Sequence, residues 1–182
     1  MAVKKGQFLL TGLVFIGLIL VTLSFTVLDF SRGEPGRLIY NDIEEAVPNQ
    51  VEQLSREYSG ESLLENFQAF TFTHRDRVTA SGNSLGYTAV VGERSGRKFK
   101  VYVGNFRDSS QSFTVEVNGN STSFTVASDD IRELGYPASG NYAVNVTGER
   151  FSKQLDVRDG RFALVFYRYE NEKSVRQDTY IG

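Results

Sequence analysis

Hydrophobic and polar positions divide the chain into three regions with different patterns. From Phe8 to Leu28 the residues are uncharged and mostly apolar. Between Leu38 and Phe70 apolar residues recur every three or four positions, and from Thr71 onward apolar and polar residues tend to alternate. These patterns are typical of a membrane-spanning helix, of amphipathic helices and of half-buried strands, respectively.

The apolar run predicts a transmembrane helix over residues 7–30. A helical span needs about 20 apolar residues, and this run supplies that length. Lys4 and Lys5 precede the run while Asp29 follows it, so the positive-inside rule places residues 1–6 in the cytoplasm as a basic leader. A secretory signal peptide is disfavoured because its apolar region is shorter and ends in small residues. We expect a single-pass protein of the cell membrane with an extracellular head, in contact with lipid through residues 8–28.

Residues 31–70 are expected to link the span to the head through amphipathic helices. Gly and Pro within residues 32–36 are expected to interrupt the membrane helix first. Pro48 predicts a kink or a split in the first amphipathic helix, because proline removes one ladder hydrogen bond. A second short helix is expected from Ser62, its N-cap, with Glu65 as the capping-box partner.

Residues 71–169 are expected to form the head, an antiparallel β-sandwich of Ig-like or jelly-roll type, so the fold class is mainly β. The alternation of apolar and other residues is clearest over residues 99–103 and 113–117, which begin with Phe99 and Phe113. The candidate strands recur at the spacing expected of a sandwich, over residues 70–80, 87–91, 99–103, 113–117, 123–127, 141–147, 151–157 and 162–169. The last of them is apolar on both faces and is expected inside a sheet. Residues 170–182 are expected to be a loosely held polar tail.

Turn residues predict how neighbouring strands pair. Asn118-Gly119 and Asp159-Gly160 are dipeptides that accept positive φ at both centres of a type I′ turn, so each predicts a tight hairpin. Gly148 predicts a similar turn between the strands on either side of it.

Composition excludes several function classes. The net charge of −2 and the pI near 5.5 argue against a nucleic-acid partner, since such domains present a basic face to phosphates. The absence of Cys and the presence of a single His exclude thiolate metal sites and leave only carboxylates as ligands. We expect no metal and no cofactor.

Three short motifs invite catalytic or metal-binding interpretations that their contexts disfavour. The G-x-S-x-G pattern over residues 82–86 lacks the later histidine and the βαβ context of a hydrolase. His74-Arg75-Asp76 lacks every other kinase element and is expected on a strand. Asp129-Asp130 is expected at a helix N-terminus, where carboxylates are favourable, in preference to a calcium site. No catalytic residue is predicted, and the protein is not expected to be an enzyme.

Two N-x-[ST] sequons indicate N-glycosylation. Asn120 follows the predicted turn, and Asn145 falls on the polar phase of its strand. Both side chains are expected to be exposed.

The first residues also suggest proteolytic processing. Lys4-Lys5-Gly6-Gln7, followed at once by the apolar run, resembles the class III signal peptides of archaeal type IV pilins and related surface filament subunits over about the first 25 residues. The resemblance implies cleavage between Gly6 and Gln7 by a membrane peptidase. It also implies that the apolar helix becomes the packing core of a filament.

The sequence thus supports two function classes. The first is a membrane-anchored extracellular β-domain protein with a structural, adhesive or assembly role, whose partners are copies of itself or other envelope proteins. The resemblance implies a pilin-like filament subunit as one form of this class. The second is a membrane-tethered carbohydrate-binding module or hydrolase, with Tyr87, Tyr102 and Tyr167 as expected surface aromatics.

Overall fold

The structure is a computed structural model that describes residues 35–158, 160–170 and 175–181. The basic leader, the predicted span and the Gly6–Gln7 processing site lie outside the described residues. The chain divides into two compact units, Met1–Asn41 and Asp42–Gly182, and the account below concerns the second. Among the described residues, no helix is both long enough and apolar enough to cross a membrane.

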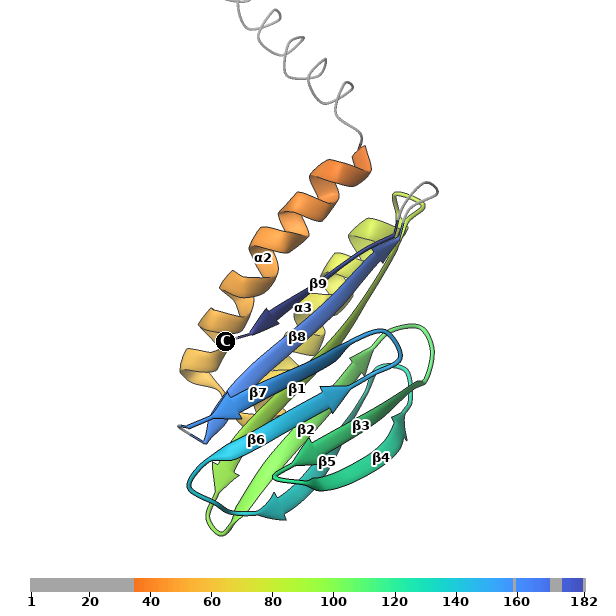
Figure 1. The fold of residues 1–182 in the computed structure, drawn as a ribbon. Helices are drawn as coiled ribbons and strands as arrows, with labels where there is room; N and C mark the ends of the chain where they lie inside the picture. The colour runs from red at the N-terminus through yellow and green to blue at the C-terminus, as the bar shows by residue number, and fades with distance from the viewer. Residues whose placement is uncertain (1–34, 159, 171–174, 182) are drawn as a thin grey trace, which may run out of the picture. The chain divides into compact units, whose positions relative to one another are not determined.

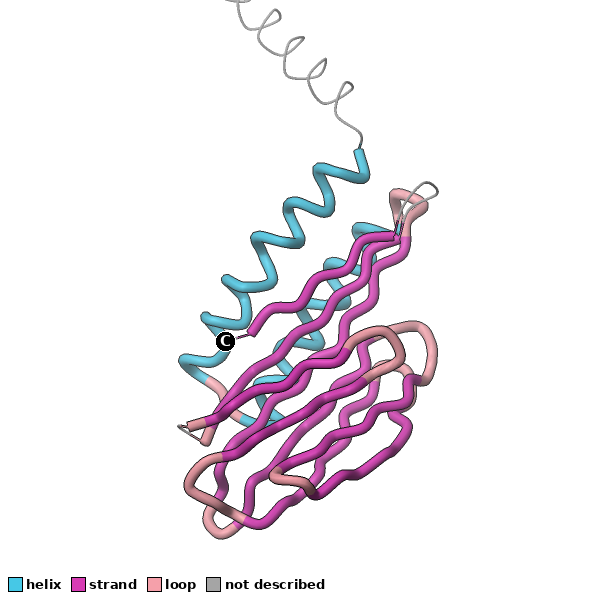
Figure 2. The backbone as a smooth tube through the Cα atoms, in the orientation of Figure 1, coloured by secondary structure: helices cyan, strands magenta, loops and turns pink. Residues whose placement is uncertain are grey.

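The second unit is mainly β, as predicted, with two antiparallel sheets (Figures 1 and 2). In the described part of the chain the larger sheet has the strand order β5-β2-β1-β8-β9 and the smaller one β4-β3-β6-β7. The strands are β1 Ser84–Ser95, β2 Lys98–Phe106, β3 Gln111–Val117, β4 Asn120–Val126, β5 Asp130–Pro137, β6 Tyr142–Thr147, β7 Ser152–Val157, β8 Arg161–Glu170 and β9 Val175–Ile181. The strand after Gly160 lies between β1 and β9, which confirms its predicted interior position.

The hydrophobic core fills the space between the two sheets. Alternate residues of β3, such as Phe113 and Val115, face Phe99 and Val101 of β2, and all four are buried. Phe99 also stacks on Tyr142 of the smaller sheet, with ring centroids 3.9 Å apart. The period-two pattern that predicted these strands therefore marks the faces that meet in the sandwich.

Two helices precede the strands: α2 Pro35–Glu57 and α3 Gly60–Thr79. The predicted split at Pro48 is wrong, because α2 continues through it. Its buried residues Ile43, Val47, Val51 and Leu54 lie on both sides of the proline, so packing holds the two halves as one helix. The N-cap prediction is also wrong: α3 begins at Gly60 after Ser59, so Ser62 and Glu65 lie inside the helix.

The predicted strand over residues 70–80 belongs to α3 instead. Phe67, Thr71 and Val78 of α3 are buried, so the helical spacing decides the structure and the local alternation of Phe and Thr does not. The His74-Arg75-Asp76 motif therefore lies on a helix. The helical region extends to Thr79, beyond the predicted boundary at residue 70, and the strands begin at Ser84.

Helix α3 covers the face of the larger sheet that points away from the smaller sheet. Phe67 packs edge-on against Tyr87 of β1, with ring centroids 5.9 Å apart, and also contacts Phe106 of β2 at 6.3 Å. Arg161, at the start of β8, donates hydrogen bonds to the Ser55 and Tyr58 carbonyls at 2.9 and 2.5 Å and so ties the end of α2 to the same sheet. The centre of the larger sheet is thus covered on both faces, which explains why consecutive residues in the middle of β1 and β8 are buried.

The turn predictions have mixed outcomes. Asn118 and Gly119 have φ of 49° and 82° and join the paired strands β3 and β4, as expected of a type I′ turn. The hairpin predicted at Gly148 is also confirmed by the pairing of β6 with β7, although Gly148 itself does not adopt a positive φ. The hairpin predicted at Asp159-Gly160 is wrong, because β7 and β8 belong to different sheets and this connection crosses the sandwich.

Two strands were not predicted. The segment after Asp129-Asp130 is β5 and not a helix. Asp129 adopts a φ of 56° and its backbone N–H donates to the Asn105 carbonyl at 2.8 Å, so it turns the chain into the edge of the larger sheet. The expected polar tail contains β9, which pairs with β8 along its length.

His74 gives the head a predictable response to acid. Burial, and next the positive charge of Arg77, lower the pKa of His74, while Asp42 opposes them. A depressed histidine pKa contributes stability that is present above the unfolded value of about 6.5 and is lost as pH falls through the folded pKa. We expect the wild-type melting temperature to fall more than that of His74→Phe between pH 7.5 and pH 5. Equal shifts in the two proteins, measured by circular dichroism, would contradict this assignment.

Candidate functional site

The residues singled out in the sequence do not come together in one site. Asn120 is exposed as expected, whereas Asn145 is half-buried on β6 and lies 3.5 Å from the Ser152 hydroxyl. The two sequons lie on different strands of the smaller sheet. Their glycosylation stays a prediction.

The aromatic residues assigned to a carbohydrate surface are not on the surface. Tyr87, Tyr102 and Tyr167 are all buried, and Tyr87 and Tyr167 contact each other with ring centroids 6.2 Å apart. Burial raises the pKa of the Tyr87 phenol. These tyrosines belong to the packing between the larger sheet and the helices, so this part of the carbohydrate-binding hypothesis is wrong.

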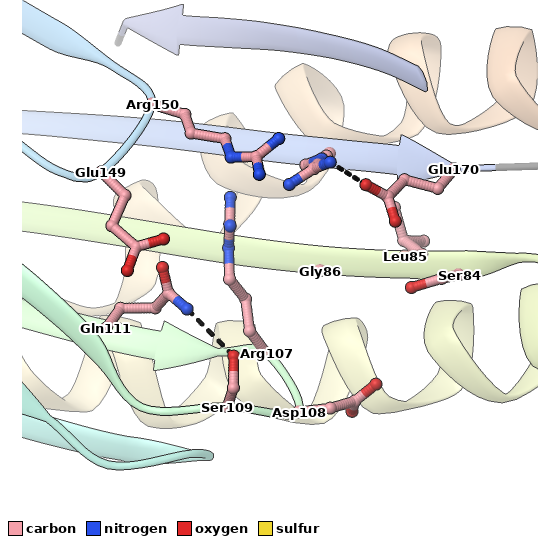
Figure 3. A pocket seen from close by; sticks show the side chains of 11 residues that line it. Ser84, Leu85, Gly86, Arg107, Asp108, Ser109, Gln111, Glu149, Arg150 and Glu170 are labelled. Atoms are coloured by element: carbon pink, nitrogen blue, oxygen red, sulfur yellow. Dashed lines mark hydrogen bonds and ion pairs between the residues drawn. The ribbon is translucent and has the colours of Figure 1, made fainter. Parts of the chain in front are cut away.

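A polar pocket lies at one end of the sandwich (Figure 3). Because neighbouring strands are antiparallel, this end gathers the starts of β1 and β3, the ends of β2 and β8, and the β6–β7 loop. The pocket has a volume of about 290 Å³. Its lining is Ser84, Leu85, Gly86, Arg107, Asp108, Ser109, Gln111, Glu149, Arg150, Arg168 and Glu170.

Arg107 enters the pocket over a glycine. A Cβ atom on Gly86 would approach the Arg107 Cγ to 2.8 Å, so the absence of a side chain on Gly86 leaves room for the arginine stem. The Arg107 guanidinium lies 5.2 Å from the centroid of the Phe166 ring in a cation–π contact. Within the described residues this guanidinium has no hydrogen-bond acceptor, and its Nε is buried.

Two more arginines complete the cationic wall. Arg168 forms an ion pair with Glu170, and its Nε is buried without an acceptor among the described residues. Arg150 comes from the exposed β6–β7 loop. Figure 3 shows the Arg150 and Arg107 side chains reaching toward the same space from different walls of the pocket.

The pocket combines this positive charge with acceptors. Burial is the main cause that lowers the pKa of Arg107, and the neighbouring Arg168 adds to it, while Glu149 opposes both. Asp108 and Glu170 are already paired with Arg75 and Arg168. The lining thus holds the guanidinium groups of Arg107, Arg150 and Arg168 together with three carboxylates, and Glu149 forms no ion pair among the described residues. An anion would relieve the repulsion among like charges here.

A hydrogen-bonded brace holds the loops beneath the pocket. Arg75 of α3 binds both carboxylate oxygens of Asp129, at 2.9 and 3.2 Å. Asn105 is fully buried, and its Nδ2 lies within 3.1 Å of the carbonyls of Ser109, Val126 and Ala127. Ser128 donates to the Arg107 carbonyl at 2.6 Å. The backbone that carries Arg107 is therefore fixed by partners on α3, β2 and the β4–β5 connection.

The outer face of the smaller sheet forms a second polar surface. Its hydroxyls pair across strands: Thr114 with Ser123 at 2.9 Å and Ser112 with Thr125 at 3.3 Å. Together with Thr147 they line a shallow hollow of about 430 Å³. Each of these hydroxyls keeps hydrogen-bonding capacity beyond its cross-strand partner, and the hollow is shallow, so this face suits broad polar contact more than the enclosure of a small molecule.

Sequence reasoning missed the arginine pocket. Its members are far apart in the chain, and only the strand connectivity places the end of β2 beside the end of β8. One signal was present, because Arg168 interrupts an otherwise apolar strand. A cation in a buried strand needs a partner or a ligand.

Comparison with protein-family models gives no matching family, and comparison with curated proteins gives no matching relative.

Proposed function

We propose that this protein is a single-pass membrane-anchored surface protein whose extracellular β head has a structural, adhesive or assembly role. The observation that carries the proposal is the apolar run from Phe8 to Leu28, which precedes the compact, mainly β unit Asp42–Gly182. An uncharged run of this length favours a bilayer. The head supplies a broad polar sheet face and two sheets whose edge strands can contact other chains.

Membrane anchoring is tested by extraction. The full-length chain is expected to stay in the membrane pellet after alkaline carbonate treatment, while a chain with Leu13→Asp and Leu18→Asp in the predicted span is expected in the supernatant. Recovery of the wild-type chain in the supernatant would contradict the anchor.

A filament role makes a narrower prediction about the N-terminus. If the class III leader is cleaved as the resemblance implies, intact mass spectrometry of chain isolated from membranes is expected to show a protein that begins at Gln7. A protein that still begins at Met1 or Ala2 would contradict the pilin-like form of the proposal, and the apolar run would then be an uncleaved membrane anchor.

Membership of the Ig-like or jelly-roll class of β-sandwiches stays a prediction. Ig-like or jelly-roll membership was expected, yet β1 lies at the centre of the larger sheet, whereas the first strand of a constant-type immunoglobulin domain lies at an edge.

A second candidate function is ligand binding by the tethered head, the carbohydrate-binding form of the alternative. It is favoured by the polar pocket at the end of the sandwich, where arginine donors and a carboxylate acceptor converge. The hydrolase form of that alternative has no specific observation in its favour and stays a prediction.

A further inference from the structure

We infer that the arginine pocket binds the carboxylate of a single acidic sugar unit, such as a hexuronic acid. This inference rests on the ligand-binding function proposed above. It does not depend on the membrane anchor, because every residue of the pocket belongs to the second unit.

The donors of the pocket fit a carboxylate. Guanidinium groups bind planar carboxylates through paired N–H donors, and such charge-assisted hydrogen bonds are the strong ones. Arg107 and Arg168 each have a buried Nε–H that lacks an acceptor within the described residues. These two Nε atoms are closed to solvent, so the donors open to a ligand are the terminal guanidinium nitrogens of Arg107, which have no acceptor among the described residues, and those of the exposed Arg150.

The carboxylates of the lining disfavour a ligand with several negative charges. The lining holds three arginines, Arg107, Arg150 and Arg168, and three carboxylates, those of Asp108, Glu149 and Glu170, so its formal charges balance. A polyphosphate would bring several negative charges close to Glu149 and Glu170, which is unfavourable. A monoanion can contact the Arg107 and Arg150 guanidinium groups with less repulsion of this kind.

The remaining polar groups fit hydroxyls. Glu149 accepts hydrogen bonds, while the hydroxyls of Ser84 and Ser109 both donate and accept them. Gln111 is oriented by bonds from its Nε2 to the Ser109 hydroxyl and the Ser110 carbonyl, at 3.0 and 3.1 Å. A volume of about 290 Å³ corresponds to about ten water molecules at roughly 30 Å³ each, which suits one sugar unit and not an oligomer.

Arg107 is held rigidly in the pocket, whereas Arg150 is not. Gly86 and Phe166 fix the Arg107 stem and guanidinium, and Ser128 fixes its backbone. Arg150, in contrast, is exposed and comes from a loop. Arg107 is therefore expected to act as a preformed donor for the ligand. Arg150 is expected to add a second donor and a positive charge while contributing little to the stability of the head.

The test is isothermal titration of the full-length chain in a non-ionic detergent with sodium glucuronate, and separately with glucose and inorganic phosphate. Saturable binding of glucuronate with no detectable heat from glucose is expected. Arg150→Gln, which removes an exposed side chain, is expected to weaken glucuronate binding about tenfold without lowering the melting temperature. Arg107→Gln is expected to abolish measurable binding.

The matched control is Arg97→Gln, which removes the same charge from an exposed residue of the β1–β2 hairpin at the other end of these strands. It is expected to bind glucuronate as the wild type does. If phosphate binds and glucuronate does not, the ligand-binding function stands and the sugar-acid inference falls. If none of the three probes binds, or if Arg97→Gln weakens binding as much as Arg150→Gln, both fall.

Discussion

Asn105→Asp is expected to destabilise the head by at least about 3 kcal/mol at neutral pH, although the two side chains have nearly the same shape. Asn105 is fully buried, and its amide nitrogen faces the carbonyls of Ser109, Val126 and Ala127. Aspartate replaces that donor by an oxygen, so an ionised carboxylate would face three carbonyl oxygens without a donor. Either the charge is buried unpaired or the loops move apart.

The effect of this substitution depends on pH in a known direction. The site disfavours the charged form of the new carboxyl, so its folded-state pKa is raised above the unfolded value. Stability relative to wild type is therefore better preserved at acid pH and is lost as pH rises through the folded pKa. Urea titrations of the full-length chain in mild detergent, at pH 4.5 and pH 7, are expected to show the larger difference at pH 7.

The matched control is Asn141→Asp, which makes the same chemical change at an exposed side chain. It is expected to alter stability by less than about 0.5 kcal/mol. An Asn105→Asp protein as stable as Asn141→Asp at pH 7 would show that the buried amide does not hold the loops together.

Phe67→Ala is expected to cost about 3–5 kcal/mol, because it removes the central side chain between α3 and the larger sheet. Phe67 is fully buried and contacts the rings of Phe70, Tyr87 and Phe106, at centroid distances of 5.4, 5.9 and 6.3 Å. Truncation leaves a cavity that the neighbouring rings cannot fill without leaving their own contacts. Loss of this packing is expected to free α3 from the sheet.

Phe72→Ala is the control for this substitution, because Phe72 lies on the same helix and is only half-buried. It is expected to cost less than about 1.5 kcal/mol, measured by urea titration followed by circular dichroism. Equal losses in the two variants would contradict the placement of α3 on the sheet through Phe67.

The sandwich was largely predictable because its core strands have one buried and one exposed face. Phe113 and Val115 alternate with polar residues, so the period alone identifies β3 and its inward face. Only Tyr136 is buried in β5, so this edge strand carries no alternation to detect. The segment over residues 70–79 shows the opposite error, because its alternating Phe and Thr residues resemble a strand while their contacts are helical.

The candidate site was less predictable because it depends on connectivity. Arg107 directly follows β2, and Arg150 lies in the loop between β6 and β7. The sequence predicts these strands, but nothing near either arginine indicates that the two side chains meet. Their convergence follows from β3 lying between β4 and β6, which brings the β6–β7 loop to the end of β2. Turn chemistry was misleading at Gly160, where a dipeptide typical of hairpins connects two sheets.

The central claim is that the head lies outside the cell while the first residues stay in the cytoplasm. The chain contains no cysteine, so a single introduced cysteine reports its own location. Ser121→Cys, at an exposed position of β4, and Ala2→Cys would be treated with a membrane-impermeant maleimide on intact cells. We predict labelling of the β4 cysteine in intact cells and of the N-terminal cysteine only after lysis; protection of the β4 cysteine until lysis would contradict the account.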